Sequence, residues 1–132
     1  MIAEEDDSMR RARIIAAGFS ALLVSVAAVP AFAGYGAIAF DEKSAKYGFG
    51  WNEDTQKRAD ETALQGCNSE GCKVVVRVPP RRCGALATGE NKGTAWAAGA
   101  EAARDAAKLR ALEGCQKRTS GKCVVRGSDC NR

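Results

Sequence analysis

The feature that most constrains the fold is a five-residue phrase that the chain uses twice, 48 positions apart. Residues 63–67 read ALQGC and residues 111–115 read ALEGC. Each copy is typical of the last turn of a helix, which a glycine ends and a nearby cysteine ties to another segment. Two copies are too few to bury the core of an open stack of repeats. The pattern therefore predicts one domain made of two similar units.

The first unit predicts a strand hairpin, a helix and a third strand. Strands are expected at residues 35–40 and 45–51 because both segments are short, apolar and rich in glycine or aromatic side chains. Asn52 is expected to cap a helix that ends at Gly66. The β-branched run at residues 72–78 has the composition of a central strand.

The second unit repeats this order with weaker patterns. We expect strands at residues 84–87 and 94–98, a helix at 101–113 and a last strand at 123–126. The expected class is α+β, with two tandem β-hairpin/helix/strand (ββαβ) repeats that share one core and that disulfides stabilise.

Small side chains predict a close approach between helix and sheet. Gly48 and Gly50 lie on one face of the second strand, and a bare strand face lets another backbone approach closely. Ala59 and Ala63 are one turn apart on the helix. We therefore expect the helix to lie flat against this strand.

Six cysteines and no histidine indicate how the small domain is stabilised. Such a cysteine content in a short exported chain is typical of a disulfide framework. Four cysteines at 67, 72, 115 and 123 leave zinc binding as an alternative, although their spacings differ from those of common zinc modules. The equivalent positions in the two units favour three disulfides, which are Cys67–Cys72, Cys115–Cys123 and Cys83–Cys130.

The N-terminal segment predicts export. Arginines precede an apolar run at residues 14–29, and residues 31–33 (AFA) have the small side chains at which signal peptidase cleaves. We expect residues 1–33 to be a signal peptide and 34–132 to be the single mature domain, periplasmic or secreted, with no stable membrane insertion after cleavage. The acidic start makes Met9 an alternative first residue, and an uncleaved anchor is the alternative to cleavage.

The side chains that most enzymes use are scarce. The lack of histidine excludes Ser-His-Asp and Cys-His catalysis and imidazole metal sites. Carboxylates remain as three acidic doublets, and two carboxylates facing each other could hydrolyse glycans. Their positions instead suit a turn, a helix start and a solvated helix face, so we predict no catalytic residue, no metal and no cofactor. The doublets are Asp41-Glu42, Glu53-Asp54 and Asp60-Glu61.

Aromatic and basic side chains are the remaining candidates for binding. Tyr35, Tyr47, Phe49, Trp51 and Trp96 are expected to fill the core between small residues rather than to form an exposed platform. Basic residues near loops of the two units would attract anions if the fold brought them together, and without a stacking motif we expect no nucleic-acid binding. This possible anion-binding surface consists of Arg81, Arg82, Lys117, Arg118, Lys122 and Arg126.

The ordered glycine, aromatic and cysteine motifs resemble a known bacterial family. The motifs are Tyr35-Gly-Ala-Ile-Ala, Tyr47-Gly-x-x-Trp51, Ala63-Leu-x-x-Cys67, Cys72-x-Val-Val-Val, Cys83-Gly-Ala-Leu-Ala and Ala111-Leu-x-x-Cys115. Together they are similar to the secreted domain of unknown function 4189. The resemblance implies an exported or envelope-associated domain with the same duplication and carries over no catalytic residue.

These observations favour a small exported binding or interaction module. Its partner would be a protein or an anionic envelope polymer, because the chain is mildly basic, with a formal net charge of +4. A carboxylate-dependent enzyme acting on the envelope or on glycans and a secreted host-directed effector are the alternatives.

Overall fold

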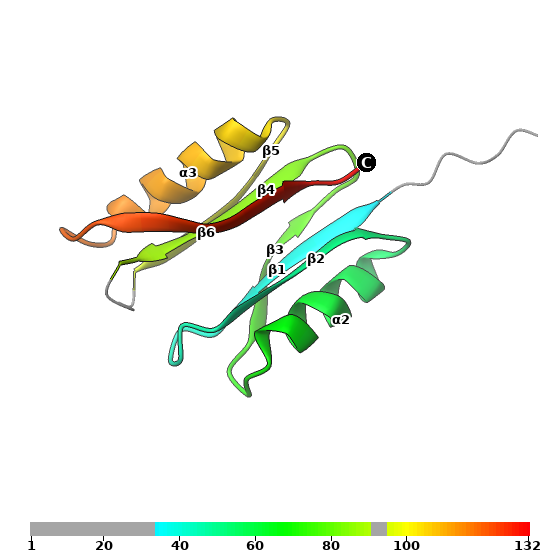
Figure 1. Cartoon of the computed structure of the whole chain (residues 1–132), viewed down its shortest axis with the longest axis horizontal. Coiled ribbons are helices and arrows are strands. Elements are labelled where there is room, and N and C mark those ends of the chain that lie inside the picture. The colour runs from blue at the N-terminus through cyan, green and yellow to red at the C-terminus, as the bar shows by residue number, and fades with distance from the viewer. Residues whose placement is uncertain (1–33, 91–94) are drawn as a thin grey trace, which may run out of the picture. The chain divides into compact units, whose positions relative to one another are not determined.

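The structure is a computed structural model that describes residues 34–90 and 95–132 (Figure 1). The predicted signal peptide, residues 1–33, lies outside the described residues, so its cleavage stays a prediction. No helix within the described ranges is long and apolar enough to cross a membrane.

Each unit is a three-stranded antiparallel sheet with one helix packed on it. The strand order is β2-β1-β3 in the first sheet and β5-β4-β6 in the second, so the first strand of each unit is central. In chain order the elements are β1 (Tyr35–Phe40), β2 (Tyr47–Glu53), α2 (Gln56–Cys67), β3 (Lys73–Val78), β4 (Cys83–Gly89), β5 (Trp96–Glu101), α3 (Arg104–Gln116) and β6 (Cys123–Cys130).

The two sheets share an irregularity at the same position. The register shifts between Ile38 and Ala39 where β1 pairs with β3, and between Leu86 and Ala87 where β4 pairs with β6. A bulge of this kind is a specific local feature of a strand pair. Its recurrence at equivalent positions, together with the element order, confirms the two predicted ββαβ repeats.

The prediction that residues 72–78 form a central strand is wrong, because β3 is an edge strand. Its β-branched composition has another cause. Val74 packs with the cluster under α2, whereas Val75 and Val76 pack between the two sheets. A strand with both faces covered has an almost continuous apolar sequence wherever it lies in the sheet.

The helix ends also differ from the prediction. Thr55, rather than Asn52, caps α2, because its hydroxyl accepts a hydrogen bond of 3.1 Å from the Arg58 amide. Asn68 ends α2 in the left-handed conformation with a φ of 51°, so Gly66 lies inside the helix. The second helix begins at Arg104, three residues after its expected start.

Gly66 lies within α2 where the helix contacts β2, and a Cβ added to it would lie 3.3 Å from the Gly48 Cα. A Cβ atom added to Gly48 would come within 2.1 Å of the Ala63 carbonyl oxygen, and one on Gly50 within 2.4 Å of the Ala59 oxygen. Ala59 and Ala63 are fully buried. The predicted flat packing of the helix on the strand is therefore confirmed. Gly48 and Gly50 are needed because the helix backbone lies too close for a side chain, and not because the chain turns there.

The domain has four layers, with the two sheets facing each other between the two helices (Figure 1). One apolar cluster lies between each sheet and its own helix. A third cluster joins the units, and its fully buried members are Ile38, Phe40 and Leu86. The expected shared core is this layer between the sheets.

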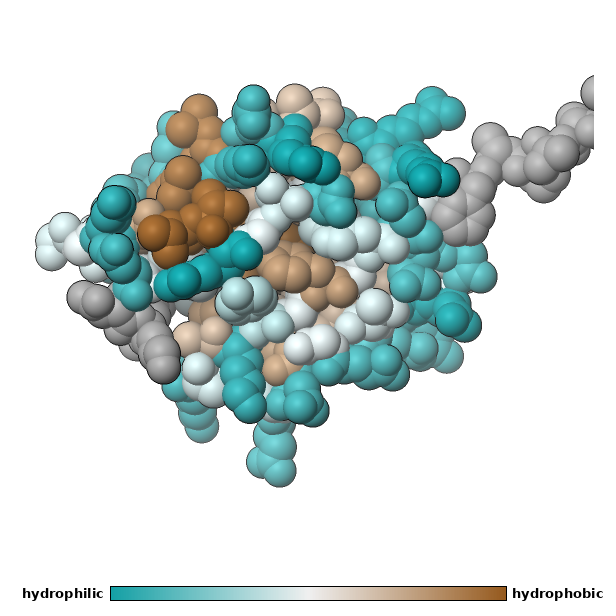
Figure 2. Space-filling view, viewed as in Figure 1, coloured by the Kyte–Doolittle hydropathy of each residue, from teal (hydrophilic) through white to brown (hydrophobic). Residues whose placement is uncertain are grey.

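Aromatic side chains of the first unit fill space that glycines of the second unit leave open. A Cβ on Gly127 would lie 2.6 Å from the Phe49 ring, and one on Gly84 would lie 3.0 Å from the Trp51 ring. Phe49, Trp51 and Trp96 therefore serve the core, whereas Tyr47 is 37% exposed. On the outer surface, Figure 2 shows an apolar patch over β6, bordered by hydrophilic side chains.

All six cysteines are in disulfides, and the pairs are those that the equivalence of the two units favours. Cys67–Cys72 and Cys115–Cys123 each tie a helix end to the start of the next strand, with Cα–Cα distances of 6.2 Å in both. Cys83–Cys130 joins register partners on β4 and β6.

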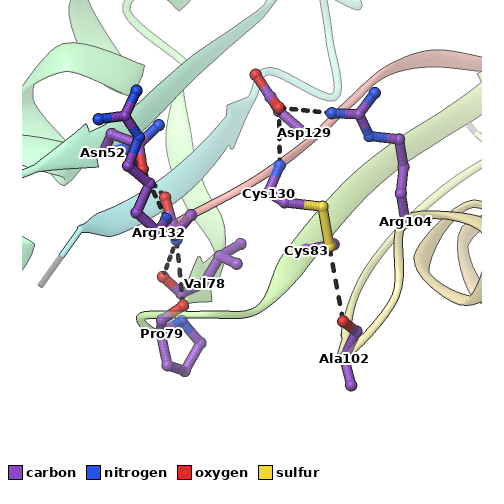
Figure 3. Close-up of a disulfide and its surroundings, with 10 residues drawn as sticks. Asn52, Val78, Pro79, Cys83, Ala102, Arg104, Asp129, Cys130 and Arg132 are labelled. Atoms are coloured by element: carbon purple, nitrogen blue, oxygen red, sulfur yellow. Dashed lines mark hydrogen bonds and ion pairs between the residues drawn. A yellow bond between two sulfur atoms is a disulfide. The ribbon is translucent and has the colours of Figure 1, made fainter.

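The C-terminal residues 131–132 join the second unit to residues 52 and 78–82 of the first unit, and we call this contact the C-terminal junction (Figure 3). The Asn131 side chain is buried, donates to the carbonyl oxygens of Val78 (2.7 Å) and Pro79 (3.2 Å), and accepts from the Asn52 amide (3.0 Å). In return, the Arg132 amide donates to the Asn52 side chain at 2.8 Å. Asn52 thus has a structural role at this junction and adopts a φ of 54°, which asparagine tolerates better than most residues.

Candidate functional site

The end of the sandwich opposite the C-terminal junction gathers the loops of both units (Figure 1). The Trp96 indole N–H donates to Glu42 at 3.0 Å, and its ring lies 5.3 Å from Phe40, so segments of the two units meet here. Both local disulfides also lie at this end. We define the loop end as residues 40–47, 68–73, 88–90, 96, 117–123 and 126.

Asp41 holds two loops of the first unit together. Its buried carboxylate accepts from the Ser44 hydroxyl (2.8 Å), the Lys43 amide (2.9 Å) and the Ser69 hydroxyl of the α2–β3 loop. These hydrogen bonds, that from Ser69 foremost, lower the pKa of Asp41 to about 2. A Cβ on Gly71 would lie 2.5 Å from the carboxylate, so the loop closes directly over it.

A hollow of about 650 Å³ opens between these two loops. Phe40 and Val75 supply apolar surface, and the two lysines of the lining, Lys43 and Lys73, are outnumbered by its three carboxylates. Because Asp41 and the Cys67–Cys72 disulfide fix the surrounding loops, the hollow has a defined shape before any partner binds. Its remaining lining residues are Asp41, Glu42, Ser44, Ser69, Glu70 and Gly71.

Two arginines of the second unit are held at the loop end by neutral groups. The Arg118 guanidinium donates to the Trp96 carbonyl oxygen at 2.6 Å and lies 5.3 Å from the centre of the indole ring. The Arg126 guanidinium donates to the Thr88 hydroxyl at 2.7 Å and to the Gly89 carbonyl oxygen at 3.3 Å. Neither arginine forms an ion pair with an acidic side chain of the described residues.

The six basic residues singled out in the sequence do not form one cluster. Lys117, Arg118, Lys122 and Arg126 lie at the loop end, whereas Arg81 and Arg82 lie at the C-terminal junction. The Arg81 amide donates to the Arg132 carbonyl oxygen at 3.2 Å. The reason is topological. Lys117, Arg118, Lys122 and Arg126 lie before or near the start of β6, whereas Arg81 and Arg82 follow the end of β3, and these two points are at opposite ends of the sheets.

Three further lysines, at 43, 46 and 73, join the loop end, and the sequence patterns missed them. They come from a turn and a strand start of the first unit, and only tertiary packing brings these segments beside the second unit. The loop end therefore carries seven basic side chains, Lys43, Lys46, Lys73, Lys117, Arg118, Lys122 and Arg126, and four acidic ones, Asp41, Glu42, Glu70 and Glu90.

The ion pairs of the described residues all lie elsewhere. Arg58 pairs with Glu53 and Asp54 at the start of α2. The remaining three pairs are Arg77–Asp60, Arg104–Asp129 and Arg110–Glu101. Exposed pairs of this kind contribute little stability, but they neutralise local charge. The positive charges of the loop end are thus left without an acidic partner among residues 34–90 and 95–132.

The three acidic doublets lie in different places. Asp41 is a structural acceptor, and Glu42 receives the Trp96 indole N–H. Glu53 and Asp54 face Arg58, and Asp60 faces Arg77. The lowered pKa of Asp41 is the opposite of what a general acid needs at neutral pH. Among the described residues, no three acidic or cysteine side chains are grouped to hold a metal ion.

Known proteins similar to this chain include uncharacterized proteins of mycobacteria. One from Mycobacterium bovis and two from strains of Mycobacterium tuberculosis are 41% identical to it over 64 residues. The match covers 48% of this chain and 43% of each relative, so the chain spans less than half the length of these relatives. No solved structure matches the chain.

The family is shown by a match to the whole described fold. The model of the family called domain of unknown function (DUF4189) matches residues 35–130, from the first residue of β1 to the last residue of β6. The expectation drawn from the glycine, aromatic and cysteine motifs is therefore confirmed, and this chain is a member of the DUF4189 family.

Proposed function

We propose that the domain is an exported binding module whose loop end holds an anionic polymer of the cell envelope. The observation that carries the proposal is the distribution of charge. Seven basic and four acidic side chains gather on the loop end, a net charge of 7 − 4 = +3, and none of the seven basic side chains forms an ion pair within the described residues. Such a field attracts anions and raises their local concentration.

The rigidity of the loop end supports binding. Cys67–Cys72 and Cys115–Cys123 fasten the two helix-to-strand loops, and Asp41 fastens the first turn to one of them. Side chains held on fixed loops lose less conformational entropy on binding. The three disulfides also indicate an oxidising compartment outside the cytoplasm, where an envelope polymer would be met.

A polymer fits the loop end better than a protein partner does. Protein interfaces are anchored by buried apolar and aromatic side chains. The large apolar side chains exposed among the described residues are Tyr47, Leu64 and Leu109, and only Tyr47 belongs to the loop end. The apolar patch over β6 lies on a strand whose side chains are half-buried at most positions. Charges spread over several segments instead suit a chain that carries a repeated negative charge.

Binding to sodium polygalacturonate, measured by isothermal calorimetry with neutral dextran as the control polymer, tests the proposal. We expect binding to polygalacturonate alone, and we expect it to weaken as salt is raised, because mobile ions screen exposed charges. Replacing two lysines with Lys117→Gln and Lys122→Gln should weaken binding about fivefold, since each exposed charge contributes roughly 0.5 kcal/mol.

A matched control removes the same net charge at the opposite end. The Arg81→Gln, Arg82→Gln variant should bind within about twofold of the wild type, because these arginines lie at the C-terminal junction. Equal weakening by the two variants would show a charge effect without a site. Retention of an acidic protein but not of polygalacturonate would overturn the polymer as partner.

A further inference from the structure

The two units offer an internal comparison that separates what the fold needs from what one unit adds. Val75 is the residue left unpaired at the bulge of β3, and Arg126 is its counterpart in β6. The residue on the adjacent strand differs too. Val75 has Phe40 of β1 beside it, and Arg126 has Thr88 of β4, which occupies the position equivalent to Phe40. An apolar pair therefore satisfies the fold in the first unit, and the second unit has a hydroxyl and a guanidinium instead.

Placing Arg126 at this position costs free energy of hydration. Thr88 is only 3% exposed and Arg126 is partly buried, so both polar groups lose water in the folded state. Their mutual hydrogen bond of 2.7 Å compensates for part of that loss. The positive charge itself has no acidic partner among the described residues, and the first unit shows that the architecture does not require it.

Arg118, from the α3–β6 loop, is anchored on the strand next to that of Thr88. It donates to the carbonyl oxygen of Trp96, and Trp96 is the register partner of Thr88 across β4 and β5. Neighbouring strands are about 5 Å apart. The two guanidinium groups are therefore anchored on paired residues of adjacent strands.

Most donors of the two arginines stay free of protein acceptors. Each guanidinium carries about five N–H donors. Within the described part of the chain, one donor of Arg118 and two donors of Arg126 have acceptors. Glu42 and Glu90 also belong to the loop end, but Glu42 receives the indole N–H of Trp96, and neither forms an ion pair with these arginines.

We propose that Arg118 and Arg126 form an oxyanion subsite, which takes one phosphate or carboxylate group of the bound chain. Guanidinium groups bind such groups through paired hydrogen bonds, which an ammonium cannot reproduce. The subsite rests on the proposed function and adds to it, because Lys117 and Lys122 attract a polyanion whereas the two arginines fix one of its charged groups.

The test is an amide NMR titration of the oxidised domain with sodium phosphate and, separately, sodium acetate, with sodium chloride at matched ionic strength. We expect the largest shifts at Thr88, Gly89 and Arg118 with phosphate or acetate, and the stronger of the two identifies the group. Shifts of equal size with chloride, or larger shifts at Arg81 and Arg82, would overturn the subsite.

Two substitutions of Arg126 sharpen the test. Arg126→Val restores the residue that the first unit has at this position, so the domain should fold and should bind the oxyanion at least about tenfold more weakly. Arg126→Lys keeps the charge but loses the paired donors, and it should recover only part of the affinity. Wild-type affinity in Arg126→Val would overturn the subsite.

The outcomes for the subsite and for the proposed function are separable. If Arg126→Val binds polygalacturonate like the wild type while the Lys117→Gln, Lys122→Gln variant does not, the subsite fails and the proposed function stands. If Arg126→Val loses phosphate or acetate binding but no polymer binds the wild type, the subsite stands and the polymer proposal fails. The lysine variant should keep phosphate affinity within about twofold.

Discussion

In the layer between the sheets, the first unit contributes large aromatic side chains and the second unit contributes small residues. β2 places Phe49 and Trp51 there, whereas the corresponding positions of β5 are Ala98 and Ala100. The Phe49 ring is accommodated by Gly127, where the first unit has Val76, whereas the Trp51 ring lies beside both Gly84 and its first-unit counterpart Gly36. The two copies have thus become complementary rather than interchangeable, and two copies of either unit alone would not reproduce this packing.

The contact between helix and sheet differs between the units as well. In the first unit, Gly48 lets α2 approach the strand backbone directly. In the second unit, Ala97 stands at the equivalent position, and the space comes from the helix, because a Cβ on Gly114 would lie 2.7 Å from the Ala97 Cβ. At this contact the first unit has a glycine on both the strand (Gly48) and the helix (Gly66), whereas the second unit has a glycine on the helix alone (Gly114).

The largest expected effect comes from making the first unit resemble the second at this contact. Gly48→Ala should destabilise the domain by about 3 kcal/mol, because the added methyl group would collide with the helix backbone, which cannot move without displacing the sheet. Urea unfolding followed by circular dichroism measures the change. The reverse replacement, Ala97→Gly, should cost about 1 kcal/mol or less, and equal costs would contradict this account of the two contacts.

Removal of the two local disulfides tests whether equivalent bridges have equivalent effects. The Cys67→Ser, Cys72→Ser and the Cys115→Ser, Cys123→Ser variants should each lose about 2 kcal/mol, because each bridge closes a short loop in the unfolded chain. Thermal unfolding of the oxidised proteins gives both values. A large loss in one variant alone would show that strain or native contacts, rather than loop closure, set the contribution.

A smaller effect is expected for the aromatic-to-glycine contact. Gly127→Ala should be destabilising alone, because its methyl group meets the Phe49 ring, and less so when Phe49→Leu removes the ring. A double-mutant cycle in urea should give a coupling of about 1 kcal/mol. Additive effects would mean that the two residues do not share this space.

The smallest effect concerns the loops, where Asp41 of the first unit corresponds to Gly89 of the second. Because the folded-state pKa of Asp41 is lowered from 3.8 to about 2, its contribution to stability is complete above about pH 4 and is lost as the pH falls towards 2. The difference in urea midpoint between the wild type and Asp41→Asn should therefore shrink over that range. A difference that stays constant down to pH 2 would show that Asp41 acts through shape and not through its charge.

Sequence patterns confined to one segment predicted the structure correctly. The two ALxGC phrases, the alanine columns at Ala59 and Ala63, and the bare strand face at Gly48 and Gly50 predicted the element order and the helix contact. These features depend on neighbouring residues or on one helix against one strand. The roles of Asn52 and Gly66 were predicted wrongly, because residues distant in the chain, at the C-terminal junction and on β2, decide them.

The amino-acid sequence alone determined the duplication, the order of elements, the cysteine pairs favoured by equivalence and the family. The first three follow from local propensity or from comparison of one unit with the other, and the family follows from the resemblance of the ordered motifs to those of known proteins. The tertiary structure decided which strand is central, which basic residues share the loop end and that Arg126 stands where the fold needs only a valine. Those properties arise from the packing of two sheets, in which residues far apart in the chain become neighbours and their charges act together.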